Sequence, residues 1–168
     1  MLELKAGERH PITFTLDGVE VRGFAEPRML LSDFLRHELG GTEVHVACEQ
    51  GVCGACTVLL DGKPARSCLT FAVQASGRRV ETVRSLSPPD GNLNDLQESF
   101  RRHHGLQCGY CTPGILVSSE AFLRDNAKPS EQEVREMLSG HLCRCTGYAG
   151  MVDAILATAK KRAPSTPA

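Results

Sequence analysis

The chain has 168 residues, a nearly balanced formal charge of −1 and 41% hydrophobic residues, with no tryptophan. The balanced charge gives no electrostatic basis for binding nucleic acid or an anionic membrane surface. No apolar run approaches the roughly 20 residues of a membrane span. The first residues, Met1 to Lys5, lack the apolar core of a signal peptide, so we expect a cytoplasmic protein.

The first half of the chain predicts a small β-rich domain. Apolar and polar residues alternate from Ile12 to Leu16, as in a half-buried strand, and Asp17-Gly18 is a hairpin signal. One helix is expected over Met29–Leu39, where apolar residues follow a helical period. Strands, one helix and a cysteine-rich loop indicate a β-grasp arrangement. The further strands are expected over residues 19–22, 57–60 and 80–83.

Helical periodicity dominates after residues 85–92, a segment rich in proline, serine and glycine that predicts a linker. We therefore expect a β-grasp domain over residues 1–84, a four-helix domain over residues 93–163 and a flexible tail over residues 164–168. Start signals mark three of the helices: Asn94 as a cap, Pro113 in a first turn, and a capping box from Ser130 to Glu133. The fourth helix is expected over residues 150–162.

All eight cysteines fall into two sets of four with different spacing. The first set, with gaps of four, two and eleven residues, comprises Cys48, Cys53, Cys56 and Cys68. The second set, with gaps of two, 31 and one residues, comprises Cys108, Cys111, Cys143 and Cys145. Each set supplies the four thiolates that a [2Fe–2S] cluster needs, so the chain is predicted to move electrons.

Two other uses of the cysteines compete with this interpretation. Eight cysteines could form four disulfides in a secreted scaffold, but the cysteines lie on glycine-rich loops and no signal peptide is evident. Structural zinc usually takes pairs of C-x2-4-C knuckles, which neither the first three cysteines nor the final C-x-C pair matches well. The histidines do not indicate a Rieske centre, because both cysteine sets are already complete.

The spacing of the first set is typical of plant-type ferredoxins. Gly51 and Gly54 lie between its cysteines and accept the positive φ angles that a tightly wrapped loop requires. Such a loop aims backbone N–H groups at the sulfurs, which stabilises a reduced cluster. In the second set, Cys111 lies just before the helix start at Pro113, where the helix dipole favours negative charge.

Three segments together carry a resemblance to a known family: residues 48–57, 107–114 and 142–148, which read CEQGVCGACT, QCGYCTPG and LCRCTGY. With these motifs the chain resembles the small iron–sulfur subunit of the xanthine oxidase family of molybdenum hydroxylases, of the carbon monoxide dehydrogenase small-subunit type. The resemblance covers about residues 10–160, nearly the whole chain.

The resemblance implies an α+β fold, with an N-terminal β-grasp plant-type [2Fe–2S] ferredoxin domain followed by a four-helix [2Fe–2S]-binding domain. It implies a heterotrimer, often dimerised, with a large subunit that binds molybdopterin as its cytosine dinucleotide and a medium subunit that binds FAD. The chain would relay electrons from the molybdopterin centre to FAD during hydroxylation of a substrate. It would carry no residue that is catalytic towards the substrate.

Residue roles also follow from the resemblance. Gln107 matches the glutamine whose side chain contacts the pterin, and Cys145 matches the cysteine whose sulfur approaches the pterin amino group. The cluster of the helical domain would lie near the molybdenum cofactor, and the cluster of the ferredoxin domain would lie towards the flavin. A stand-alone ferredoxin with two clusters is the alternative function that the cysteine pattern leaves open.

Overall fold

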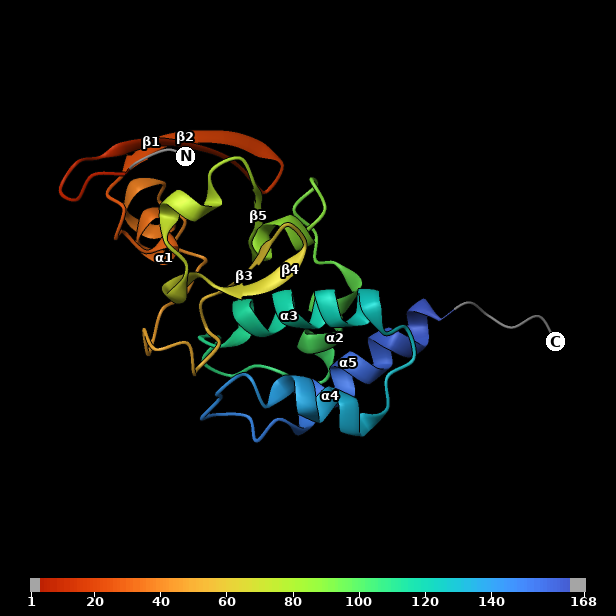
Figure 1. Ribbon diagram of the computed structural model, residues 1–168. Coiled ribbons are helices and arrows are strands. Elements are labelled where there is room, and N and C mark those ends of the chain that lie inside the picture. Colours follow the sequence, from red (N-terminus) through yellow and green to blue (C-terminus); the bar gives the residue numbers. More distant parts are fainter. Residues whose placement is uncertain (1–3, 164–168) are drawn as a thin grey trace.

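The computed structural model describes residues 4–163. A five-stranded sheet forms one side of the molecule and four helices form the other, with helix α3 next to strands β3 and β4 (Figure 1). This arrangement matches the predicted order of a β-rich first half and a helical second half. The predicted tail over residues 164–168 lies outside the described residues. Among residues 4–163, no helix combines the length and the hydropathy that crossing a bilayer requires.

The sheet has the strand order β2-β1-β5-β3-β4. Strand β1 pairs in parallel with β5, and the other neighbours are antiparallel. Two tight hairpin turns, at Asp17-Gly18 and Asp61-Gly62, have positive φ at both residues, the conformation typical of type I′ turns. The strands span His10–Leu16 (β1), Val19–Ala25 (β2), Thr57–Leu60 (β3), Lys63–Arg66 (β4) and Arg79–Glu81 (β5).

The expected strands are all present, but β1 and β2 are longer than expected, and two further differences concern the end of the sheet. The expected strand over residues 80–83 ends at Glu81, because Thr82 caps a 3₁₀ turn, η4, over Val83–Leu86. Asp61-Gly62 is a second hairpin signal in the sequence, but the bounds of strand β4 after it were not predicted. This strand lies at the edge of the sheet, where Pro64 is tolerated because its missing N–H does not break a ladder between two strands.

The expected helix over residues 29–39 is shorter and irregular. It consists of α1, Leu31–Asp33, followed by a π-helical turn, η1, Phe34–Glu38. Leu30 is extended and forms an isolated bridge with Phe71, so the chain enters the helix only at residue 31. The N–H of Gly41 then donates to the carbonyl of Leu35 at 2.7 Å. Pairing with Phe71 at the start and a local hydrogen bond at the end therefore shorten the helix that the sequence period indicates.

The four helices of the second half confirm the prediction. Two of them begin with complete capping boxes, formed by Asn94 with Gln97 and by Ser130 with Glu133. In each box the cap side chain accepts a backbone N–H and the third helical residue reaches back to the cap. The helices span Asp95–Arg102 (α2), Thr112–Asp125 (α3), Glu131–Leu138 (α4) and Ala149–Arg162 (α5).

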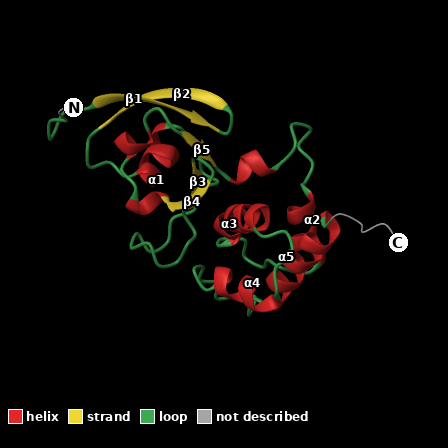
Figure 2. Ribbon diagram, turned by 45° about the vertical axis from the view of Figure 1, so that its right-hand side comes forward, coloured by secondary structure: helices red, strands yellow, loops and turns green. Residues whose placement is uncertain are grey.

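Two apolar cores are joined by a small contact. One core lies between the sheet and the helical turns α1 and η1, and the other lies among α2, α3, α4 and α5, as Figure 2 shows. Between them, Val117 and Ala121 of α3 pack on Leu59 of β3, with Val83 and Leu86 of η4 at the side. Helix α3 is thus the element through which the two halves meet.

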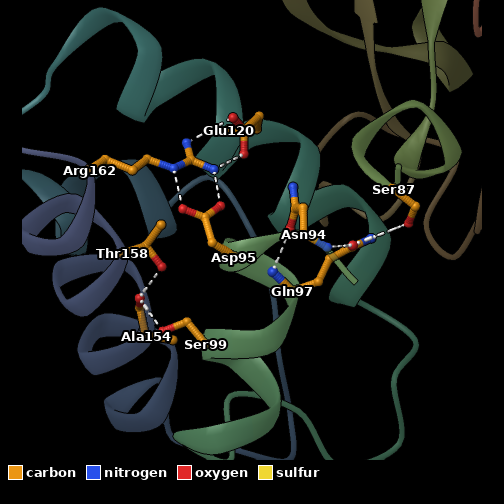
Figure 3. Close-up of polar contacts among 9 residues, drawn as sticks. All are labelled: Ser87, Asn94, Asp95, Gln97, Ser99, Glu120, Ala154, Thr158 and Arg162. Carbon is orange, nitrogen blue, oxygen red and sulfur yellow. Dashed lines mark hydrogen bonds and ion pairs between the residues drawn. The ribbon is translucent and has the colours of Figure 1, made fainter. Parts of the chain in front are cut away.

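A polar network ties α5 to the two helices beside it (Figure 3). The guanidinium of Arg162 binds the carboxylate of Asp95 in α2 and that of Glu120 in α3, at distances from 2.6 to 3.0 Å. The hydroxyls of Ser99 and Thr158 both donate to the carbonyl of Ala154, each at 2.8 Å. These contacts fix the helices that carry the second cysteine set on their connecting loops.

Candidate metal centres

The first cysteine loop runs from Cys48 to Cys56, between η1 and β3. Glu49, Gly51 and Gly54 have positive φ angles of 54°, 77° and 75°, so the loop turns sharply several times. The N–H groups of Gln50 and Cys53 both donate to the sulfur of Cys48 at 3.4 Å. The hydrogen bond from Cys53 is the main reason why the pKa of Cys48 falls to about 6. The loop therefore favours a thiolate at Cys48.

The fourth cysteine of this set comes from the end of the β3–β4 hairpin. Cys68 lies in a 3₁₀ turn, η2, over Ser67–Leu69, and the hydroxyl of Ser67 donates to the carbonyl of Cys56 at 2.8 Å. Burial, together with the neighbouring thiols of Cys56 and Cys48, raises the pKa of Cys68 to about 11. Cys53, Cys56 and Cys68 are buried and Cys48 is half-buried. The structure thus brings all four predicted residues together.

The second set is assembled from two loops of the helical half. The sulfurs of Cys108 and Cys145 are 3.5 Å apart and both residues are exposed. Cys111 is buried at the N-cap of α3, and burial raises its pKa to about 12, with further contributions from Cys143 and Cys108. The structure therefore gathers these four cysteines as well, with Cys111 buried, Cys143 half-buried and the other pair at the surface.

Tyr148 supports the loop that carries Cys143. It stands at the N-cap of α5 with a positive φ of 68°. Its hydroxyl accepts the N–H of Cys143 at 2.7 Å and donates to the carbonyl of His141 at 3.0 Å. The loop is thereby closed by one side chain, which also packs on the helical core. The sequence analysis did not assign this role, because the contact depends on the unusual backbone angle at Tyr148.

The two cysteine loops are in direct contact. The N–H of Leu142, next to Cys143, donates to the carbonyl of Cys53 at 2.9 Å. Gly54 packs so closely on His141 that a Cβ at position 54 would overlap the imidazole Nδ1 and come within 2.7 Å of the carbonyl of Gly140. A Cβ at Gly114, in the first turn of α3, would overlap the carbonyl of Gly54. Two small residues therefore allow the loops to interlock.

His141 is buried between the two loops. It is 2% exposed, and its Nε2 lies 2.8 Å from the hydroxyl of Ser118. Burial lowers the pKa of His141 to about 4, so the imidazole is neutral at physiological pH. The contact of His141 with the first loop could not be read from the sequence, because it joins residues that are far apart in the chain.

Gln107 lies beside Cys145 at the surface. Its side-chain amide donates to the carbonyl of Cys145 at 3.0 Å, and both residues are exposed. The structure thus joins the two residues that were expected to face a pterin, on the outside of the helical half.

The donor sets fit clusters of iron and sulfide. Each set consists of four free thiols. In each set, the sulfurs of at least one pair of cysteines are in contact. Backbone N–H groups point at the sulfur of Cys48, as a cluster with negative sulfur ligands requires. Within residues 4–163, no three side chains of His, Cys, Asp or Glu are placed as ligands of a single metal ion.

Two family models match the chain. Residues 14–86 match the model described as a 2Fe-2S iron-sulfur cluster binding domain, and residues 82–156 match the model of a [2Fe-2S] binding domain. Each match contains one complete set of four cysteines.

Relatives of known function match over nearly their whole length. The gamma subunit of caffeine dehydrogenase from Pseudomonas sp. (strain CBB1) is 50% identical over 149 residues, which cover 87% of this chain and 89% of the relative. The small subunit of nicotine 6-hydroxylase from Paenarthrobacter nicotinovorans is 51% identical over 143 residues, 82% of this chain and 86% of the relative. In a crystal structure of quinoline 2-oxidoreductase from Pseudomonas putida 86, a chain with 52% identity superposes with a TM-score of 0.87, covering 90% of this chain and 94% of that one.

Proposed function

The chain belongs to the small iron–sulfur subunits of the xanthine oxidase family of molybdenum hydroxylases, and on this premise we propose which residues hold its clusters. As a member it carries two [2Fe–2S] clusters and transfers electrons within a multi-subunit oxidoreductase. We assign the first cluster to Cys48, Cys53, Cys56 and Cys68. We assign the second cluster to Cys108, Cys111, Cys143 and Cys145.

One observation carries this assignment: the thiols of each set converge, and they do so in pairs. The 3.5 Å between the sulfurs of Cys108 and Cys145 is close to the about 3.7 Å expected for two thiolates on one tetrahedral metal with bonds of about 2.3 Å. We therefore propose that these two share one iron and that Cys111 and Cys143 share the other. Contacts of the first set likewise pair Cys56 with Cys68.

When bound, each [2Fe–2S] cluster takes up and releases one electron at a time. The protein adjusts this chemistry through the surroundings of the sulfurs. The N–H groups of Gln50 and Cys53 donate to Cys48, and the first turn of α3 places its N-terminus at Cys111. Both features favour added negative charge and so raise the reduction potential.

We propose that the surface around Gln107 and Cys145 meets the molybdopterin of a large subunit. Both residues are exposed and are joined by a hydrogen bond, so the amide is oriented at the outer edge of the second cysteine set. The first set would then lie towards FAD in a medium subunit. The chain would pass electrons from the molybdopterin side to the flavin side through the contact between the two cysteine loops.

The relatives' names, with subunits called gamma, beta or small, show that these proteins work in complexes of several subunits. We propose a heterotrimer, possibly dimerised, with one subunit for molybdopterin cytosine dinucleotide and one for FAD. A stand-alone ferredoxin is not favoured by these relatives. We propose residues 1–84 and 93–163 as the two domains, joined by residues 85–92, and the two separate cores support this division. The cytoplasmic location stays a prediction.

We further infer that the complex acts on a nitrogen heterocycle. Caffeine, nicotine and quinoline, for which relatives at 50% to 52% identity are named, are all nitrogen heterocycles, whereas the relatives named aldehyde oxidoreductase are 38% to 46% identical. Dye reduction by the purified complex should be faster with quinoline, nicotine or caffeine than with benzaldehyde. A preference for the aldehyde would contradict this inference.

Metal analysis tests the main assignment. The chain purified with its partner subunits should contain four iron and four acid-labile sulfide per copy, as two [2Fe–2S] clusters require, and it should be brown and bleach with dithionite. Zinc in place of iron, or half of the expected iron and sulfide, would contradict the assignment of both sets.

A further inference from the structure

Tyr110 joins the segment of the second cysteine set to the approach of the first. Its ring stacks on the imidazole of His45, with ring centroids 4.8 Å apart and planes inclined by 25°. Its hydroxyl donates to the carbonyl of Val46 at 2.5 Å, and its own carbonyl lies 2.8 Å from Nδ1 of His45. Because a carbonyl oxygen only accepts, the Nδ1 of His45 carries the proton of this bond. Three contacts therefore connect the same two short segments.

These segments lie beside the proposed ligands of both clusters. Tyr110 stands between Cys108 and Cys111, and Val46 precedes Cys48 by two residues. Among the described residues, the hydrogen bonds from residues 106–111 to the sheet half of the chain all involve Tyr110. The other arm of the second set is held separately, by the bond from Leu142 to Cys53. One arm of the second set is thus bonded to the sheet half through Tyr110. The other arm is held by Leu142, by Gly140, whose carbonyl accepts from Arg66 at 2.6 Å, and by the packing of His141 on Gly54.

Apart from the bond from Gln107 to the carbonyl of Cys145 and the burial of Cys111, little else restrains the segment around Tyr110. Cys108 is exposed. Gly109 has a positive φ of 81°, and a Cβ added to it would have no neighbouring atom within 4 Å. Tyr110 itself is 47% exposed, so its ring is held on one side only, by His45. Loss of the stack would leave Cys108 on a loop that is free to shift away from the first set.

We propose that His45 and Tyr110 form a clamp that fixes the separation of the two clusters and so sets the rate of electron transfer between them. The proposal rests on the cluster assignment given above. Both are positioning residues: they act through the backbone next to the cysteines and coordinate no metal. The clamp requires an aromatic ring at position 110 and a flat partner at position 45, together with the two polar contacts.

Magnetic coupling between the clusters tests the clamp without relying on turnover. A reduced [2Fe–2S] cluster carries an unpaired electron, and two reduced clusters split each other's EPR signals by an amount that falls steeply with their separation. The dithionite-reduced complex should be compared with its Tyr110→Leu and His45→Val variants. The control is Phe24→Leu, which also removes an exposed aromatic ring but lies on the edge strand β2, where no cysteine of either set is found.

We expect both clamp variants to keep two cluster signals and lose the splitting, while Phe24→Leu keeps both the signals and the splitting. Reduction of the first cluster after rapid mixing with substrate should also be slower in the clamp variants. Unchanged splitting in both variants would overturn the clamp and leave the cluster assignment standing, whereas fewer than two signals in the wild-type complex would overturn the assignment itself. If Tyr110→Leu loses the second cluster, the EPR splitting in His45→Val decides whether the clamp sets the separation, because position 45 lies outside the second set.

Discussion

The imidazole of His141 occupies the space that a side chain at position 54 would need. Because residue 54 is glycine, the loop after Cys53 and the loop before Cys143 can touch. This contact joins the two cysteine sets across the boundary between the sheet and the helices. Together with the bond from Leu142 to Cys53, it places the two loops that we assign to the clusters in direct contact.

Replacing Gly54 with alanine should separate the loops. A Cβ would meet the imidazole of His141 and the carbonyl of Gly140, and the positive φ of 75° is itself unfavourable for alanine. We expect Gly54→Ala to lower the stability by about 2–5 kcal/mol, from backbone strain plus overpacking. The measurement is the midpoint temperature at which the visible absorption of the clusters is lost.

Gly77→Ala is the matched control for this change. Gly77 has the same φ of 75°, but nothing lies within 4 Å of the added Cβ. It should cost only the backbone term of about 1–2 kcal/mol. Equal losses in the two variants would show that the contact with His141 contributes nothing.

Asp17→Asn should stabilise the protein at neutral pH. Burial raises the pKa of Asp17, and the nearby carboxylate of Glu43 adds to the rise, although hydrogen bonds from Thr82 oppose it. A raised pKa in the folded state means that stability is greatest below the ordinary value of 3.8 and is lost as the pH rises through the folded pKa. An amide avoids this loss and keeps an acceptor for the N–H of Thr82.

We expect Asp17→Asn to raise the free energy of unfolding by about 1 kcal/mol or less at pH 7. The melting midpoint should rise by about 2–4 °C for each kcal/mol gained. The gain should vanish in acid, where Asp17 is protonated. A variant that is less stable than the wild type at pH 7 would show that the carboxylate is needed by Thr82 or Arg84.

Arg162→Met should loosen the helical half. Arg162 holds the carboxylates of Asp95 and Glu120 together, and removing it leaves two half-buried negative charges side by side. The expected loss is about 1–3 kcal/mol. The exposed pair of Arg135 and Glu131 offers a control, since Arg135→Met should change the stability by about 0.5 kcal/mol or less.

The loss caused by Arg162→Met should depend on pH. The hydrogen bond from Arg162 lowers the pKa of Asp95, so this carboxylate contributes stability above its ordinary pKa of 3.8 and loses it as the pH falls through the folded value. Far-UV circular dichroism during heating, repeated at decreasing pH, should show the difference between wild type and variant shrinking below pH 3.8. A constant difference would contradict an ionic contribution.

Gln107→Ala should separate electron transfer from cluster assembly. Gln107 binds the carbonyl of Cys145 and donates no ligand, so iron content should stay unchanged. If its side chain orients the pterin, turnover of the complex should fall about tenfold, the lower range for residues that support a metal site. Gln132→Ala, on the exposed face of α4, is the control and should have no effect. Unchanged turnover in Gln107→Ala would contradict the pterin contact.

Local signals predicted most of the elements. The hairpin at Asp17-Gly18, the capping boxes at Asn94 and Ser130 and the first-turn proline at Pro113 each act within a few residues, so the sequence was enough to place them. The helix around residues 29–39 was predicted too long because its first residues pair with Phe71, far along the chain. Strand β4 lacked any alternation that could have indicated it.

The cysteine sets could be predicted because ligand spacing follows from cluster geometry. The contacts between the sets could not, because they join residues such as His45 and Tyr110, which are 65 positions apart and belong to no common motif. Gly54 and Gly114 gave a partial signal, since glycine often marks a close approach of two backbones. The partner of each glycine is set by tertiary packing alone.

The most direct test of the account is EPR of the dithionite-reduced complex carrying Cys68→Ser or Cys145→Ser. The wild type should show two distinct [2Fe–2S] signals. Cys68→Ser should alter or remove only one of them, and Cys145→Ser only the other, because we assign each set of four cysteines to its own cluster. If both substitutions changed the same signal, the division of the cysteines into two independent sites would be wrong.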